Sequence, residues 1–190
     1  MNRGRLFVIS APSGTGKSTV LARIRERFPD IAFSVSCTTR PCRGSERDGV
    51  DYHFVDRETF EDMVKRGEFV EWAEVHGEFY GTPRTLLEQM TARGQDVLLD
   101  IDVQGGMAIK GAFPDAVTIF LVPPSLEELK SRLANRGTES DDQVKLRLEN
   151  ARREMSYRQN YDYSIVNDRV ERACDELAAL IGRMRGGGGA

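Results

Sequence analysis

A glycine-rich loop lies between a strand pattern and a helix pattern near the start of the chain. The continuous apolar run LFVIS (6–10) is typical of a buried strand, and APSGTGKST (11–19) follows it directly. Apolar residues then recur at helical spacing from Val20 to Phe28. A strand, a glycine-rich loop and a helix in this order are the setting of a phosphate-binding loop, so they predict a nucleoside triphosphate site.

The chemistry of such a loop depends on backbone N–H groups that converge on an anion at the positive end of the next helix. Gly14 and Gly16 allow the close backbone approach, and Lys17 can reach the β- and γ-phosphates. The Ser18 hydroxyl can coordinate Mg²⁺. The simpler alternative is a glycine-rich turn that binds nothing. The predicted ATP-binding loop consists of Ala11, Pro12, Ser13, Gly14, Thr15, Gly16, Lys17, Ser18 and Thr19.

One position departs from the pattern G-x-x-x-x-G-K-[ST], because Ala11 stands where glycine is expected. Ala11 precedes Pro12, and a residue before proline is held at negative φ and extended ψ. Alanine adopts that conformation without strain. We therefore expect the loop to stay competent.

The rest of the chain alternates buried-strand patterns with helical patterns. Strands are predicted at 96–102, 116–122 and 163–167. A helix is predicted after Thr82 and Pro83, which suit an N-cap and a first turn. Strands that alternate with helices imply an α/β fold, here a three-layer P-loop architecture with a mainly parallel central sheet.

Two segments interrupt this core without a Pro- or Ser-rich linker, so they are interpreted as insertions into one domain. The first is rich in Gly, Arg, Tyr and acidic residues, and the second is charged and helical with a break at NRGTES. The predicted single domain, 1–190, has a core at about 1–33, 82–124 and 158–185, insertions at about 34–81 and 125–157, and a disordered tail at 186–190.

Composition narrows the class of protein. A chain of 190 residues with 39% hydrophobic residues and a net charge of -3 suits one folded domain rather than a general nucleic-acid or anionic-membrane binder. Its three cysteines show no C-x-x-C spacing, which favours a reducing, cytoplasmic compartment. No apolar run approaches the roughly 18 residues of a transmembrane helix.

Two carboxylates follow the second predicted strand. Asp100 comes directly after an apolar run, as the Mg²⁺-associated aspartate of nucleotide hydrolases and kinases does. Asp102 lies two residues on, so both side chains point to one face while the strand stays extended. The alternative is that one of them caps the turn at QGG.

The first insertion carries groups that suit a phosphate monoester. Arg40 and Arg43 offer two guanidinium forks, and Tyr52 and Tyr80 offer two phenols. Each of them alone is more commonly a solvated surface group. Together, beside a phosphate-binding loop, they predict a site for a phosphorylated acceptor.

Carboxylates also bear on the base of that acceptor. Guanine presents N1–H and N2–H₂ as adjacent donors, whereas adenine presents an acceptor at N1. Glu71 and Asp102, with the hydroxyls of Ser36 and Thr82, form an acceptor-rich set. This set favours guanine, provided that the four side chains converge in space.

These residues bring out a resemblance to the guanylate kinase family, P-loop kinases that convert ATP and GMP to ADP and GDP. Its signature is matched by Thr38, Thr39, Arg40, Arg43, Glu46, Gly49, Tyr52 and Phe54. The segments EFVEWAEVHGEFYGTP, LLDIDVQGG, RLANRGTE and IVND match in order, so that the resemblance covers roughly 5–182. The departures are Ala11, and Cys42 where a proline is common.

The resemblance implies a role for each matched position. The GMP phosphate would be held by Arg40, Arg43, Tyr52 and Tyr80, and guanine by Ser36, Glu71, Thr82 and Asp102, with Gly81 allowing backbone approach. Ser18 and Asp100 would lie at the metal, and Arg136 and Asn167 beside the adenine. The catalytic set would be Lys17, Arg40, Arg132, Arg136 and Arg147, of which the last three lie in the second insertion, a lid.

Two other functions stay open at this stage. A scaffold module with this fold would bind proteins, although such modules typically have a degraded phosphate loop and Gly16-Lys17-Ser18 is intact here. A P-loop kinase for another acceptor is the second. The expected partners are GMP, dGMP and ATP, with Mg²⁺ as cofactor and without nucleic acid or membrane; a homo-oligomer is possible.

Overall fold

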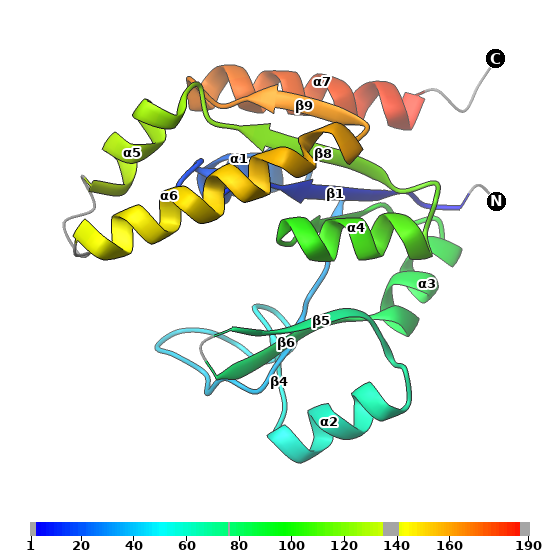
Figure 1. Ribbon diagram of the computed structural model, residues 1–190. Coiled ribbons are helices and arrows are strands. Elements are labelled where there is room, and N and C mark those ends of the chain that lie inside the picture. Colours follow the sequence, from blue (N-terminus) through cyan, green and yellow to red (C-terminus); the bar gives the residue numbers. More distant parts are fainter. Residues whose placement is uncertain (1–2, 76, 135–140, 187–190) are drawn as a thin grey trace.

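A five-stranded parallel sheet forms the centre of the upper body in Figure 1. The computed structural model describes residues 3–75, 77–134 and 141–186. The sheet order is β2 (Ala32–Phe33), β7 (Val97–Asp100), β1 (Leu6–Ser10), β8 (Val117–Val122) and β9 (Tyr163–Val166). β1 is central and pairs Val8 with both Leu99 and Thr118. Every residue of β1 and β8 is buried, which explains their continuous apolar runs.

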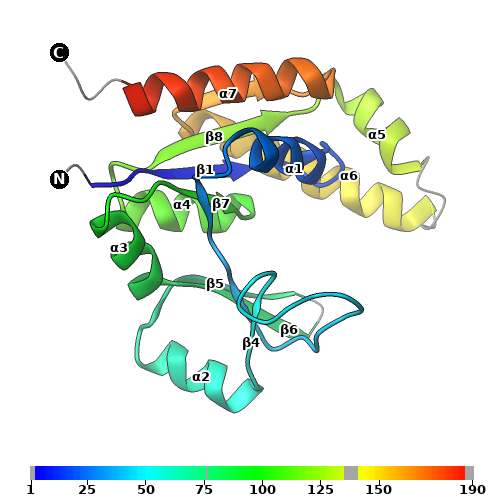
Figure 2. The ribbon, with the colours of Figure 1, turned by 180° about the vertical axis from the view of Figure 1, so that it is seen from behind.

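Helices cover both faces of this sheet. α1 (Lys17–Arg27) and α7 (Val170–Gly186) lie on one face. α3 (Arg84–Ala92) and α4 (Val103–Ala112) lie on the other, as the opposite views of Figures 1 and 2 show. The predicted α/β fold with a mainly parallel central sheet is therefore confirmed.

Alternate residues of β1 point into two separate cores. Phe7 packs with Ile24 of α1 on one face of the sheet. Val8 packs with Ile109 of α4 on the other face. All four side chains are fully buried, at 0% exposure, so the carboxyl end of β1 and the loop that follows it are held from both sides.

A smaller, mixed sheet forms the lower body in Figure 1. Its order is β4 (His53–Phe54), β3 (Cys37–Thr38), β6 (Glu78–Pro83) and β5 (Phe69–Val75), and α2 (Arg57–Lys65) covers it.

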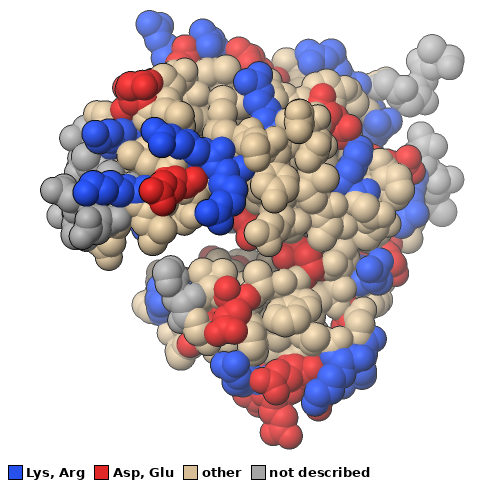
Figure 3. All heavy atoms as spheres, viewed as in Figure 1, with Lys and Arg blue, Asp and Glu red and all other residues tan. Residues whose placement is uncertain are grey.

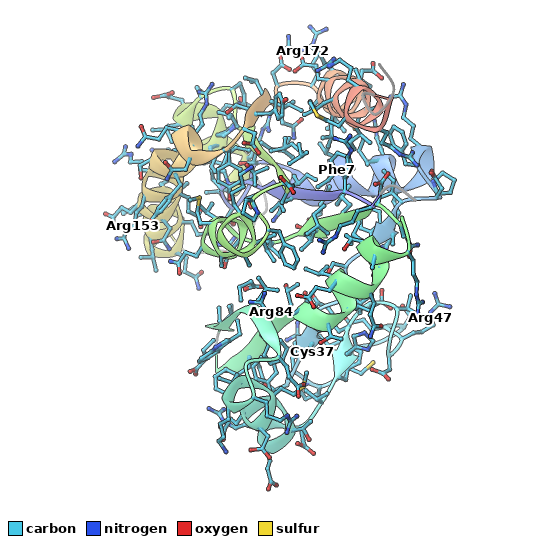
Figure 4. The ribbon with its side chains drawn as sticks, turned by 90° about the vertical axis from the view of Figure 1, so that its right-hand side faces the viewer. Phe7, Cys37, Arg47, Arg84, Arg153 and Arg172 are labelled. Carbon is cyan, nitrogen blue, oxygen red and sulfur yellow. The ribbon has the colours of Figure 1, made fainter. Side chains whose placement is uncertain are left out.

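The lower body has an aromatic core of its own. Phe60 of α2 stacks on Phe69 at 4.5 Å and on Phe79 at 5.3 Å between ring centroids. A Cβ at Gly81 would lie 2.8 Å from the Phe69 ring, so packing alone requires glycine there. In Figure 4, Phe7 lies in the upper body and Cys37 in the lower one.

The second insertion is helical. It consists of α5 (Leu126–Ala134), α6 (Asp141–Met155) and the 3₁₀ helix η1 (Ser156–Asn160). The two α-helices share a small core in which Leu133 and Ala151 are fully buried. The predicted break at NRGTES, 135–140, lies outside the described residues.

Four expectations need correction or extension. Thr82 does not cap α3: it belongs to β6, and Pro83 is the N-cap. The tail was predicted from 186, but Gly186 is still helical in α7. The edge strand β2 was missed because it is only two residues long. The strand predicted at 96–102 ends at Asp100.

Within the described ranges, no helix is both long and apolar enough to cross a membrane.

Candidate functional site

The glycine-rich loop connects β1 to α1 at the carboxyl edge of the parallel sheet. Gly14 and Gly16 have φ values of 85° and 92°, in the left-handed region that favours glycine. A Cβ at Gly14 would lie 2.8 Å from the Leu133 side chain of α5. α1 begins at Lys17 and has no acidic residue in its first turn, so its positive end is open to an external anion.

Two residues from segments distant in the sequence, Arg132 and Asn167, donate hydrogen bonds to the backbone of the loop. The Thr15 carbonyl accepts hydrogen bonds from Asn167 Nδ2 at 2.7 Å and from Arg132 Nη1 at 3.4 Å. Arg132 Nη1 also donates to the Asn167 carbonyl at 3.1 Å. Both side chains therefore support the backbone of the loop. Their predicted contacts, with the phosphoryl group for Arg132 and with adenine for Asn167, stay predictions.

Lys17 joins the loop to the end of β7. Its Nζ lies 2.7 Å from Asp100 Oδ1 and donates to the Ile101 carbonyl at 2.7 Å. Ser18, in the first turn of α1, is exposed. The predicted metal residues thus lie at the same, carboxyl edge of the sheet, Ser18 after β1 and Asp100 at the end of the neighbouring parallel strand β7.

Asp102 is the N-cap of α4. Its Oδ1 accepts from the Gly105 N–H at 2.7 Å, and its carbonyl accepts from Ser10 Oγ at 3.0 Å. The capping alternative is therefore correct for Asp102, whereas Asp100 pairs with Lys17. Because the capping bond involves only Oδ1, capping leaves Oδ2 available to a ligand.

Glu71 and Thr82 face each other across the antiparallel pair of β5 and β6. Thr82 Oγ1 donates to Glu71 Oε1 at 2.5 Å. Burial raises the pKa of Glu71, the Thr82 hydrogen bond opposes this shift, and the Asp102 charge adds to it. Glu71, Asp102 and Gln104 line one cavity of about 340 Å³. The structure thus brings together Glu71, Thr82 and Asp102, which were predicted to read guanine.

Ser36 comes directly before β3, whose antiparallel register with β6 sets Cys37 opposite Gly81 and therefore sets Ser36 toward Thr82. It lines a second cavity, of about 270 Å³, with Tyr52 and Asp100. Glu71 is not among the residues that line this cavity. Because Tyr52 is a predicted phosphate-binding residue, Ser36 lies between Thr82 and the predicted phosphate end of the site.

Arg40 is held by a partner to which the sequence reasoning assigned no role. Its Nη1 and Nη2 donate to the Glu46 carboxylate at 3.0 and 2.8 Å, and Glu46 also accepts from the Arg43 N–H at 2.8 Å. The Arg40 guanidinium lies 5.3 Å from the Tyr52 ring centroid. The pKa of Arg40 is raised and that of Glu46 is lowered, chiefly by their mutual hydrogen bonds.

The predicted phosphate-binding residues gather around this pair. The rings of Tyr52 and Tyr80 meet edge to face, with centroids 6.0 Å apart. Arg40 is only 6% exposed, whereas Arg43 is exposed. Figure 3 shows a groove between the two bodies, with basic side chains gathered over α6 on its upper side.

The lid residues are only partly described. Arg147 lies on α6, half-buried. Arg136 lies outside the described residues. Arg153, labelled in Figure 4, also belongs to α6 and is exposed.

Comparison with known proteins decides the family. The guanylate kinase family model matches residues 3–184. This chain belongs to the guanylate kinase family. It is 52% identical over 179 residues to the guanylate kinase of Myxococcus xanthus, across 94% of this chain and 86% of that protein. It is 50% identical over 182 residues to the guanylate kinase of Aromatoleum aromaticum, across 96% and 89%.

A solved guanylate kinase has the same fold. The crystal structure of guanylate kinase from Anaplasma phagocytophilum matches with a TM-score of 0.75 and 37% identity, over 97% of this chain and 87% of that one. The match spans both bodies and the lid of this guanylate kinase family member. Glu46 could have been found in the sequence as a fixed position of the family signature.

Proposed function

We propose that this protein transfers the γ-phosphoryl group of ATP to GMP, giving ADP and GDP, and that dGMP is a second acceptor. The observation that carries this proposal is the Glu71–Thr82 pair beside Asp102, because it offers carboxylate acceptors to the N1–H and N2–H₂ donors of guanine. A phosphate-binding loop across the groove is the matching donor site.

The acceptor phosphate suits the cluster around Arg40. Arg40 and Arg43 supply charge-assisted donors, while Tyr52 and Tyr80 supply phenolic O–H groups. Glu46 holds the Arg40 guanidinium before the substrate arrives, which lowers the conformational entropy lost on binding. These residues therefore bind and orient GMP.

In the chemical step, an oxygen of the GMP phosphate attacks the γ-phosphorus of ATP and the bond to the β–γ bridging oxygen breaks. The attacking phosphate is already anionic, so the protein needs no general base. Its contribution is positioning and charge stabilisation, supplied by the loop N–H groups, Lys17 and the lid arginines Arg132, Arg136 and Arg147. Lys17 would turn from Asp100 toward the phosphates when ATP binds, before the transfer.

A magnesium site fits the oxygen donors at the edge of the sheet. Among the described residues, no group of three or more His, Cys, Asp or Glu is arranged to hold a metal. Mg²⁺ in nucleotide sites takes only one or two protein ligands, because phosphates and water complete its shell. Ser18 and Asp100 would hold it. When bound, it neutralises charge on the β- and γ-phosphates.

A coupled assay of ADP release tests this function directly. GMP, AMP, UMP and dTMP are compared as acceptors at equal concentration, with ATP and Mg²⁺. We expect GMP to be strongly preferred. Release of ADP with another base would favour the second kind of P-loop kinase, and no release with any acceptor would favour a scaffold module.

A further inference from the structure

The Asn167 side chain packs against the phosphate-binding loop. Asn167 directly follows β9 and is only 2% exposed, and its Nδ2 donates to the Thr15 carbonyl at 2.7 Å. A Cβ at Gly16 would lie 2.8 Å from the same nitrogen, so the loop folds directly against the amide. The amide therefore contacts two consecutive residues of the loop.

The hydrogen-bonding groups determine which end of the Asn167 amide faces the loop. If Oδ1 faced the Thr15 carbonyl, two acceptors would meet, so only the orientation with Nδ2 toward Thr15 gives a hydrogen bond. In that orientation Oδ1 is buried and has no hydrogen-bond partner among the described residues. A buried oxygen without a partner disfavours folding, so stability alone is a weak reason for an asparagine at this position.

The bond from Asn167 sets the direction of the next amide in the loop. In a planar trans peptide, the carbonyl of one residue and the N–H of the next point in opposite directions, and the peptide bonds of the described residues are all trans. Because the Thr15 carbonyl points at Asn167, the Gly16 N–H points away from it. This N–H has no hydrogen-bond partner among the described residues, and it comes directly before the positive end of α1. It is therefore available to an external anion.

Arg132 of α5 reinforces the same peptide. Its Nη1 donates to the Thr15 carbonyl at 3.4 Å and to the Asn167 carbonyl at 3.1 Å. The peptide between Thr15 and Gly16 thus cannot rotate without losing hydrogen bonds to two separate segments. A donor that is already oriented before the ligand arrives loses less conformational entropy on binding.

We propose that Asn167 is a positioning residue that binds the Thr15 carbonyl and thereby aims the Gly16 N–H at the polyphosphate of ATP. The inference rests on the proposed function in taking ATP as the ligand of the loop. It differs from the predicted contact of Asn167 with adenine. A residue that acts through the loop affects the binding of any polyphosphate, whether or not the ligand carries a base.

The first test compares ATP with inorganic tripolyphosphate and needs no catalysis. Dissociation constants of both ligands are measured by calorimetry, in the presence of Mg²⁺, for wild type and Asn167→Ala. We expect both constants to rise by the same factor, on the order of 5- to 10-fold. The matched control is Asn160→Ala, at an exposed asparagine of η1, which should bind both ligands as wild type does.

Two results of this comparison would overturn the proposal. A loss of affinity confined to ATP would show that Asn167 acts on the adenine, and unchanged constants for both ligands would show that it does not position the loop. A wild type that binds tripolyphosphate but does not phosphorylate GMP would count against the proposed function and leave this comparison valid.

The second test uses the wild type alone, so it holds even where Asn167→Ala melts early and fails to fold. Nuclear magnetic resonance can detect a scalar coupling through a hydrogen bond, here between Asn167 Nδ2 and the carbonyl carbon of Thr15. We expect this coupling in the free protein and also with tripolyphosphate bound. Its absence from the bound protein would overturn the proposal, because the bond would not exist when the loop holds its ligand.

Discussion

The Lys17 ammonium lies 2.7 Å from the Asp100 carboxylate, and this pair joins the first residue of α1 to the last residue of β7. The two side chains are 20% and 45% exposed, so the pair contributes little to stability, about 0–1 kcal/mol. It does hold the cation at the mouth of the loop, where the ATP phosphates are expected.

Replacing Lys17 should therefore affect turnover rather than folding. Lys17→Ala is expected to lower kcat by about 10³-fold or more, since a cation at the transferring phosphoryl contributes at that level. The melting temperature should stay near that of wild type. Lys65→Ala, which removes an exposed lysine of α2, is the control for loss of charge. An unchanged kcat in Lys17→Ala would remove this residue from the mechanism.

Glu71 should decide recognition of the base. Glu71→Gln replaces one acceptor oxygen with a donor, so kcat/KM for GMP should fall by an amount equivalent to about 2–5 kcal/mol. Glu74→Gln, at an exposed position of the same strand, should leave it unchanged. Steady-state kinetics with GMP varied at saturating ATP measure both. A wild-type KM for GMP in Glu71→Gln would mean that this carboxylate does not read guanine.

The raised pKa of Glu71 predicts a pH effect on the same quantity. A carboxyl group with a raised pKa becomes protonated at a higher pH than usual, and the protonated form is a poor acceptor for two donors. kcat/KM for GMP should therefore fall as the pH drops through the raised Glu71 pKa. The phosphate of GMP also changes its protonation state, at about pH 6. The contribution of Glu71 is the part of the profile that disappears in Glu71→Gln, and identical profiles would exclude it.

Asp162 should matter for stability instead. Its carboxylate accepts from the Thr118 N–H at 2.8 Å, from the Thr118 hydroxyl at 2.9 Å and from Lys110 Nζ at 2.9 Å, linking α4, β8 and the start of β9. Burial alone would raise its pKa, but these hydrogen bonds together lower it. Asp162→Asn should cost about 1–3 kcal/mol in the free energy of unfolding at neutral pH.

The pH dependence of that loss of stability follows from the downward shift of the Asp162 pKa. A lowered folded-state pKa gives stability that is present above the unfolded pKa and lost as the pH falls through the folded one. The difference between wild type and Asp162→Asn in urea unfolding should accordingly shrink in acid. Asp115→Asn, at an exposed loop position, is the control. A difference that stays constant down to low pH would show that the carboxylate charge is not involved.

The core could be predicted from the sequence because its signals are local. The apolar run at 6–10 and the glycine-rich loop after it together predict a strand that leads into a phosphate-binding loop. β1 and α1 lie where these patterns place them. Glu71 and Thr82 were grouped by the chemistry of guanine, and the hairpin of β5 and β6 does pair them. The hydrogen-bonding groups of guanine thus identified two residues as one site, although their spacing in the sequence alone does not pair them.

The misplaced features depend on tertiary register. Threonine is a common helix N-cap residue, but Thr82 pairs with Glu71 across the hairpin and therefore belongs to β6. The Arg40–Glu46 pair requires the conformation of the loop between them. No local pattern reports such contacts.

The most direct test follows the phosphoryl group itself. ATP labelled at its γ-phosphoryl is mixed with GMP, Mg²⁺ and excess enzyme for a single turnover, and the products are separated. The account predicts that the label appears in GDP, and that Lys17→Ala slows its appearance by about 10³-fold. Label that appears as inorganic phosphate, or that stays in ATP, would contradict it.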